Sequence, residues 1–178
     1  MSYKIIDNIL TDEELKNIQN VMFRNAFPWY FVSDAVPCNE DRFVKQYNIF
    51  CHYFLKAGCP FDDGEFGFPG TSHYIKILQP LIRKLRARAL IRIQANYYPK
   101  ADQVIEHGMH ADFPFEENNA TTAIFYLNTC NGYTKLDGDI KIASNANRLI
   151  VFPSDMLHTS STCTDRPFRA VINFNYLL

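Results

Sequence analysis

The sequence predicts an α+β fold in which strands predominate, formed by a single domain of 178 residues. Apolar residues recur at helical spacing in the first half of the chain, whereas in the second half they alternate with polar residues as in half-buried strands. Gly, Asn, Asp and Pro separate the strand-like runs, and helices followed by strands are typical of this class. We expect residues 1–88 to form a helical, loop-rich support and residues 89–178 to form the β core.

Two helices are expected in the first half. Thr11 and Glu14 match a capping box, and the apolar residues that follow at helical spacing extend the expected helix over residues 11–24. A second apolar helical face runs over residues 75–89, and Pro80 predicts either a kink or a helix that begins near it. This second helix is expected to cover a sheet.

Five runs are expected to form β-strands, and most of them lie in the second half. They comprise residues 3–6, 89–98, 121–128, 148–152 and 168–177. Residues 25–70 are rich in aromatic side chains and interrupted by Gly and Pro, which predicts short strands and long loops.

The composition excludes several classes of protein. Hydrophobic residues make up 47% of the chain and charged residues 21%, which fits a folded domain and not a disordered one. With 18 basic and 19 acidic residues the formal charge is -1, so nucleic acid is not an expected partner. The single basic cluster is expected to be a solvated face. It comprises Arg83, Lys84, Arg86, Arg88 and Arg92.

The protein is expected to be cytoplasmic. The first residues lack a basic segment followed by an apolar core, and no run reaches the ~18 apolar residues of a membrane span. The 5 cysteines contain no C-x-x-C pair, which suits reduced thiols better than a disulfide framework. We therefore expect no membrane association, and nothing in the sequence indicates an oligomeric state.

Three residues in the second half have the pattern of a metal site. His110 and Asp112 are two positions apart, so on an extended chain both side chains point to the same side. His158 follows a turn-like segment and is placed to return to the same end of the sheet. Two histidines and one carboxylate make a facial triad, which leaves coordination positions open and is typical of non-haem Fe(II) oxygenases.

This pattern resembles the 2-oxoglutarate/Fe(II) dioxygenase superfamily, in its prolyl-hydroxylase-like or alkylation-repair-like branch. Family members have H-x-D, a distant His, and then a basic residue about ten positions later that binds the far carboxylate of 2-oxoglutarate. The matching residues are His110, Asp112, His158 and Arg169. A guanidinium fork suits a carboxylate, and strand alternation puts Arg169 on one face with residues 171 and 173. Arg166 is the competing candidate, although its turn position favours exposure.

A second resemblance lies upstream of the triad. Asn96 and Tyr98 match the N-x-Y that precedes H-x-D in the alkylation-repair branch. They share a strand face with Arg92 and Gln94, and four polar residues on a buried face are costly unless the face lines a polar cavity. We therefore expect Asn96 and Tyr98 to bind the cosubstrate. The alternative is a strand edge that faces water.

The resemblance covers about residues 89–178 and implies a double-stranded β-helix, or jelly roll, with helices packed on one sheet. It also implies Fe(II) and 2-oxoglutarate as cofactor and cosubstrate, O2 as partner, and hydroxylation of a peptide, amino acid or small metabolite with formation of succinate and CO2. Two other interpretations are open. One is a cupin-like metal protein, an isomerase or hydrolase that does not use 2-oxoglutarate; the other is a jelly-roll binding module without chemistry.

Two further expectations concern residues near the predicted site. His107 is three positions before His110, and on a strand its side chain would face the opposite way, in a supporting or surface role. The aromatic segment is expected to be chiefly core, although Trp29 and Tyr30 are candidates for a substrate lid because loops commonly form the walls of such sites.

Overall fold

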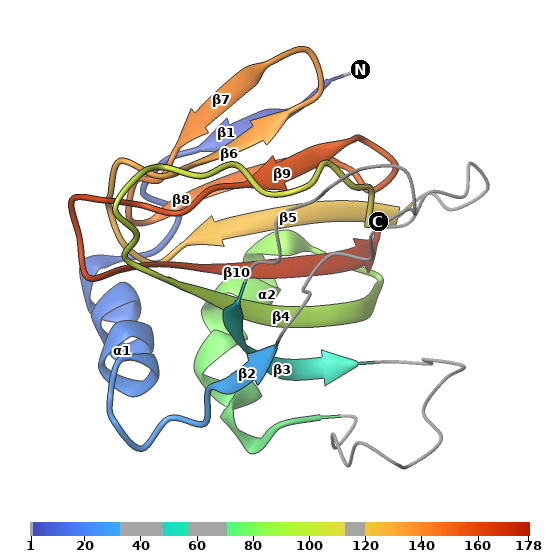
Figure 1. Cartoon of the computed structure of the whole chain (residues 1–178). Helices are drawn as coiled ribbons and strands as arrows, with labels where there is room; N and C mark the ends of the chain where they lie inside the picture. Colours follow the sequence, from blue (N-terminus) through green and yellow to red (C-terminus); the bar gives the residue numbers. More distant parts are fainter. Residues whose placement is uncertain (1, 33–47, 57–70, 113–119) are drawn as a thin grey trace.

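Two antiparallel β-sheets make up most of the structure, a computed structural model that describes residues 2–32, 48–56, 71–112 and 120–178 (Figure 1). The larger sheet has the strand order β1-β8-β5-β10-β4-β3-β2, and the smaller has the order β7-β6-β9. The strands are β1 (Lys4–Ile6), β2 (Tyr30–Val32), β3 (Ile49–Lys56), β4 (Ala89–Pro99), β5 (Ala120–Tyr126), β6 (Tyr133–Leu136), β7 (Ile140–Ala143), β8 (Arg148–Pro153), β9 (His158–Ser160) and β10 (Phe168–Leu177). The helical elements are α1 (Asp12–Met22), the 3-10 helix η1 (His73–Leu78) and α2 (Gln79–Leu85).

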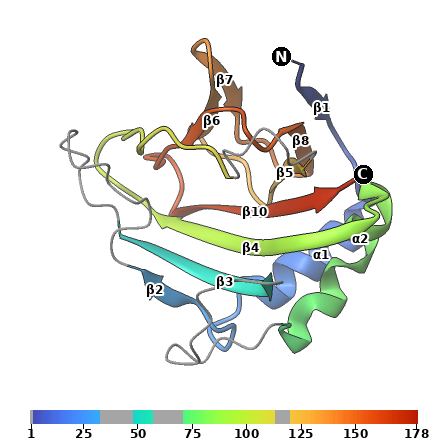
Figure 2. The same cartoon turned by 90° about the vertical axis from the view of Figure 1, so that its right-hand side faces the viewer.

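Both predicted helices are present and cover one face of the larger sheet (Figure 2). Thr11 and Glu14 form the expected capping box at the start of α1. Pro80 lies in the first turn of α2, where its missing N–H costs nothing, so this helix begins at the proline and is preceded by the separate η1. Among the described residues, no helix is long and apolar enough to cross a membrane.

Strand alternation gives the larger sheet two buried faces of different character. Ala170, Ile172 and Phe174 of β10 point toward the helices and belong to the core between helices and sheet. Val171 points the other way, into a second core shared with Leu136 of the smaller sheet. The predicted double-stranded β-helix with helices on one sheet is therefore confirmed.

All five strands predicted by range are present, and the short strands expected in the aromatic segment are present in its described part. In the described part of the aromatic segment, β2 and β3 extend the larger sheet beyond β4. The hairpin of β6 and β7, whose strands have four residues each, was not predicted. Its turn contains Gly138 and Asp139 at φ 76° and 63°, a conformation that glycine adopts without strain.

Candidate functional site

A cavity of about 600 Å³ lies between the two sheets. It is lined by Ile49, Arg92, Gln94, Asn96, Tyr98, His107, Met109, His110, Ala111, Asp112, Ile124, Thr134, Leu157, His158, Thr159, Ser160, Arg169, Val171 and Asn173. The lining therefore includes all six residues that the sequence predicts for the site. Their roles in binding metal and cosubstrate stay predictions.

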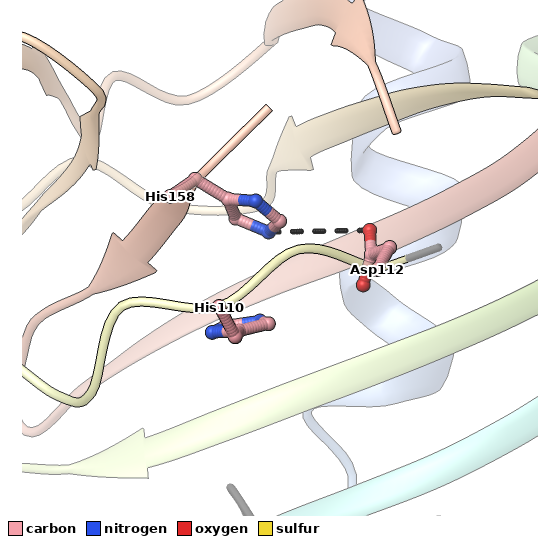
Figure 3. Close-up of side chains that lie close together, drawn as sticks. All are labelled: His110, Asp112 and His158. Atoms are coloured by element: carbon pink, nitrogen blue, oxygen red, sulfur yellow. Dashed lines mark ion pairs between the residues drawn. The ribbon is translucent and has the colours of Figure 1, made fainter. Parts of the chain in front are cut away.

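The three predicted metal ligands converge at one end of this cavity (Figure 3). One ligand atom from each of His110, Asp112 and His158 lies within 4.8 Å of the other two. The two histidines are directly opposite each other in an antiparallel bridge, in which each backbone N–H donates to the carbonyl of the other at 2.9 and 2.8 Å. This bridge joins the segment before β5 to β9 and so fixes the distance between the imidazoles.

Both imidazoles are held in the tautomer that a metal requires. Nδ1 of His110 lies 3.1 Å from the carbonyl oxygen of Gly108, and Nδ1 of His158 lies 3.1 Å from that of Met156. Because a carbonyl can only accept, each Nδ1 carries the proton and each Nε2 has a lone pair. Among the described residues, Nε2 of His158 is buried without a hydrogen-bond partner, and the carboxylate of Asp112 lies 3.9 Å from it. Burial also lowers the pKa of His158 to about 4, so the ring is neutral at neutral pH.

Asp112 receives three hydrogen bonds that leave room for one further partner. Arg92 Nη2 donates to Oδ1 at 2.6 Å, and Thr122 Oγ1 and Asn175 Nδ2 each donate to Oδ2 at 2.8 Å. A carboxylate has about four acceptor positions, so one remains for a metal ion. Burial would raise the pKa of Asp112, but the charge of Arg92 and these hydrogen bonds hold it below its ordinary value. The three residues therefore fit an iron ion bound by two nitrogens and one oxygen.

The donors to Asp112 come from a single row across three neighbouring strands. Asn175 of β10 is paired with Arg92 of β4 on one side and with Thr122 of β5 on the other. Sequence reasoning missed Thr122 and Asn175. It gave Arg92 two interpretations, as part of a solvated cluster and as a member of the polar face of its strand, and the structure supports the second.

Arg169 lies toward the other end of the cavity and is fully buried. Its Nη2 donates to Thr134 Oγ1 at 3.0 Å and its Nη1 to the carbonyl of Ser161 at 3.4 Å, while its Nε has no partner. The rings of Tyr98 and Tyr126 flank the guanidinium at 5.3 and 5.6 Å. Among the described residues no carboxylate is paired with it, and a buried cation without an anion is costly. This end of the cavity is therefore suited to an anionic ligand.

The residues predicted to bind the cosubstrate with Arg169 line the same cavity, but one neighbour of Arg169 was not predicted. Asn96 and Tyr98 line the cavity as expected, so the alternative of a strand edge facing water is excluded. Arg166, the competing candidate, is exposed and does not line the cavity. Tyr126 was missed, although it is fully buried and its ring lies 5.6 Å from the guanidinium.

The predicted direction of the His107 side chain was wrong, because the residue lines the cavity; its supporting role stays a prediction. The segment from 105 to 111 forms only isolated bridges at Glu106 and His110, so strict strand alternation does not apply to it. Nδ1 of His107 lies 2.7 Å from Ser160 Oγ. Burial, the charge of Arg169 and the nearby His110 lower the pKa of His107 to about 4.

The lid expectation also requires correction for the two aromatic residues named. Trp29 packs on the helix-covered face of the larger sheet, where its Nε1 donates to the carbonyl of Met22 at 3.1 Å and its ring contacts Tyr97. Tyr30 is exposed on β2 and does not line the cavity. Most of the remaining aromatic segment lies outside the described residues.

Comparison with solved structures supports this fold assignment. A prolyl hydroxylase from Trichoplax adhaerens, in complex with a hypoxia inducible factor peptide, matches with a TM-score of 0.64 at 18% identity over 98% of this chain and 83% of that one. A 2OG-Fe(II) oxygenase family oxidoreductase from Burkholderia pseudomallei matches with a TM-score of 0.64 at 16% identity, over 98% and 84% of the two chains. No protein-family model and no curated protein matches the sequence.

A third similar structure adds a different reaction. The epimerase SnoN, in complex with Fe3+, alpha ketoglutarate and nogalamycin RO, matches with a TM-score of 0.63 at 12% identity over 98% of this chain and 78% of that one. The chain therefore has the fold of the 2-oxoglutarate/Fe(II) oxygenases. These likenesses establish the fold, and the chemistry must be argued from the site.

Proposed function

We propose that the protein is an oxidoreductase, a 2-oxoglutarate- and Fe(II)-dependent dioxygenase. The observation that carries this proposal is that one cavity contains two incomplete binding sites of complementary chemistry. Within the described part of the chain, Nε2 of His158 is buried beside Asp112 without a hydrogen-bond partner near one end, and Arg169 is a buried cation without a carboxylate near the other. A ligand with a metal-chelating oxo acid at one end and a carboxylate at the other matches both, and 2-oxoglutarate is such a molecule.

Each residue of the cavity has a role in this proposal. His110, Asp112 and His158 would hold iron(II) and leave the remaining coordination positions to cosubstrate and O2. Arg169 would bind the far carboxylate, with Thr134 keeping the guanidinium in place. Asn96 and Tyr98 would form the wall between the two ends.

Iron(II) and 2-oxoglutarate, when bound, supply the oxidising chemistry in which O2 is consumed, 2-oxoglutarate becomes succinate and CO2, and a C–H bond is hydroxylated. The protein orients these partners and excludes water, which the buried walls of the cavity support. A peptide, an amino acid or a small metabolite is the proposed substrate, since similar structures have a peptide or a small molecule bound. A cytoplasmic location is also proposed, and the unpaired thiols of Cys51, Cys130 and Cys163 agree with it.

The test is succinate formation by the iron-loaded protein across a panel of peptides, amino acids and metabolites. We expect succinate to form only with iron, O2 and 2-oxoglutarate together, and a true substrate to increase the rate. His158→Ala and Arg169→Met should both abolish it at low 2-oxoglutarate. A protein that binds iron but neither binds 2-oxoglutarate nor forms succinate would instead support a cupin-like metal protein.

A further inference from the structure

We infer that Arg92 takes the place of the metal ion in the metal-free protein: it neutralises Asp112 and so competes with the metal for this carboxylate. This inference rests on the proposed function, because it assumes that Asp112 is a metal ligand. It predicts a consequence that a purely orienting residue would not have: removal of Arg92 should make metal binding tighter.

The burial and charge of the pair make the neutralisation necessary. The side chain of Asp112 is only 4% exposed, and a buried carboxylate without a counter-charge is strongly unfavourable. Among the described residues, Arg92 Nη2 lies 2.6 Å from Asp112 Oδ1, whereas His158 Nε2 lies 3.9 Å from Asp112 Oδ2, beyond hydrogen-bond distance. Arg92 is therefore the cation that offsets this carboxylate when no metal is bound.

The two oxygens of Asp112 receive different kinds of partner. Oδ1 accepts from the charged Arg92, whereas Oδ2 accepts from the uncharged Thr122 and Asn175, both of which are fully buried. Asn175 Nδ2 also donates to Thr122 Oγ1 at 2.9 Å, which holds these two donors together without Arg92. Loss of Arg92 would thus remove the charge and one hydrogen bond, while the two hydrogen bonds to Oδ2 would remain.

Arg92 is itself held in place, so its charge stays close to the metal position. Its Nε donates to Asn175 Oδ1 at 2.8 Å, and Asn175 is its cross-strand partner in the sheet. A fixed positive charge this close to a bound divalent cation repels it, and in a partly buried site the repulsion is only weakly screened. The same contact that stabilises the metal-free site therefore weakens metal binding.

The first experiment compares the affinity for Mn²⁺ of the parent protein, Arg92→Met and Thr122→Val, measured from the electron paramagnetic resonance signal of free Mn²⁺. We expect Arg92→Met to bind Mn²⁺ about tenfold more tightly, because a like charge is removed. Thr122→Val, which removes an uncharged orienting donor, should bind it roughly 10-fold more weakly. Weaker binding by Arg92→Met would overturn the inference and make Arg92 an orienting residue like Thr122.

The second experiment measures thermal unfolding without metal, in the presence of a chelator. Arg92→Met should lower Tm by about 4 to 8 °C, because it leaves a buried carboxylate uncompensated. In an Asp112→Asn background the same substitution should lower Tm by less than half as much, since there is no charge left to offset. Equal shifts in both backgrounds would contradict the inference.

These outcomes separate the inference from the proposed function. If the parent protein and Asp112→Asn bind Mn²⁺ with the same affinity, the proposed metal site is wrong. If Asp112→Asn abolishes binding but Arg92→Met does not tighten it, the metal site stands and the role inferred for Arg92 is wrong. Gln94→Met, on the same strand face two residues further along β4, is the matched control. It should leave both the Mn²⁺ affinity and the Tm in the presence of chelator unchanged.

Discussion

The two ends of β10 differ in how completely the protein satisfies their polar groups. Near the carboxyl end of the strand, Asn175 joins Arg92 and Thr122 around Asp112, and this carboxylate has three donors and a counter-charge. Near the amino end, Arg169 is buried and, among the described residues, is paired with no carboxylate, and its Nε has no hydrogen-bond partner there. The described residues therefore complete the surroundings of Asp112, the proposed metal ligand, whereas the cation at the other end is left without an anion.

This difference predicts that the two ends depend on their ligands to different degrees. A satisfied carboxylate keeps its geometry whether or not a metal ion is present, so the metal end is preformed. A buried cation without an anion costs stability that a bound carboxylate would recover. The anion end should therefore gain more from its ligand, and substitutions at the two ends should have opposite effects on the stability of the ligand-free protein.

The largest expected effect is loss of metal from variants of the three ligands. His110→Ala, Asp112→Ala and His158→Ala should each weaken Mn²⁺ binding beyond the roughly 10- to 100-fold loss typical of changes around a ligand. His107→Ala is the matched control, since His107 lines the same cavity but is not a proposed ligand, and it should keep Mn²⁺ affinity within a few-fold. Metal retention by all three variants would show that the ligands are assigned wrongly.

Arg169→Met should have the next largest effect, and it acts on the other end. Loss of a desolvated charge pair costs about 2 to 5 kcal/mol, so the affinity for 2-oxoglutarate should fall by roughly 30-fold or more while Mn²⁺ affinity changes little. The ligand-free variant should unfold at the same or a higher temperature than the parent, because an uncompensated buried cation is removed. Arg166→Met, at an exposed position, should alter neither the affinity for 2-oxoglutarate nor the unfolding temperature.

A smaller effect is expected from Gly132→Ala, which tests how Arg169 is positioned. A Cβ atom at residue 132 would lie 2.7 Å from both Arg169 Cδ and the carbonyl oxygen of Thr162, so the arginine must move. We expect 2-oxoglutarate to bind about tenfold more weakly, roughly the effect of 1.4 kcal/mol, with Mn²⁺ affinity unchanged. Gly138→Ala strains a backbone at φ 76° but meets nothing within 4 Å, so it should lower Tm and leave 2-oxoglutarate binding intact. Equal binding by both variants would contradict the packing argument.

The smallest expected effect is on the titration of His107, followed by nuclear magnetic resonance. Burial chiefly, and then the charge of Arg169, lower its pKa to about 4, so Arg169→Met should raise the pKa part of the way toward its ordinary value. Because the folded pKa lies below the unfolded one, the unfolded chain binds more protons between pH 6.5 and 4, and His107 makes the fold less stable as the pH falls through that window. An unchanged pKa in the variant would mean that Arg169 exerts no field on this ring.

The sequence was most informative where chemistry and local periodicity coincide. His110, Asp112, His158 and Arg169 were predicted because their order along the chain resembles a superfamily motif, and all four line the cavity. Alternation also placed residues 92, 94, 96 and 98 on one inward face, which the structure confirms.

The residues that were missed depend on register between strands that are distant in the chain. Thr122 and Asn175 meet Asp112 only because β5, β10 and β4 are aligned in one row, and no local pattern reports that alignment. Gly132 matters only because Arg169 passes it closely. His107 was placed wrongly because the backbone near Gly108 departs from a regular strand.

The most direct test of the two-ended cavity is calorimetric titration of the Mn²⁺-loaded protein with 2-oxoglutarate, 2-oxobutanoate and glutarate. The second compound keeps the metal-chelating end and lacks the far carboxylate, and the third has both carboxylates and lacks the oxo group. We predict that 2-oxoglutarate binds much more tightly than either in the parent, and that Arg169→Met reduces its affinity to that of 2-oxobutanoate. If 2-oxoglutarate binds the parent no better than 2-oxobutanoate does, or binds equally well without metal, the two ends do not serve one ligand and the proposed function is wrong.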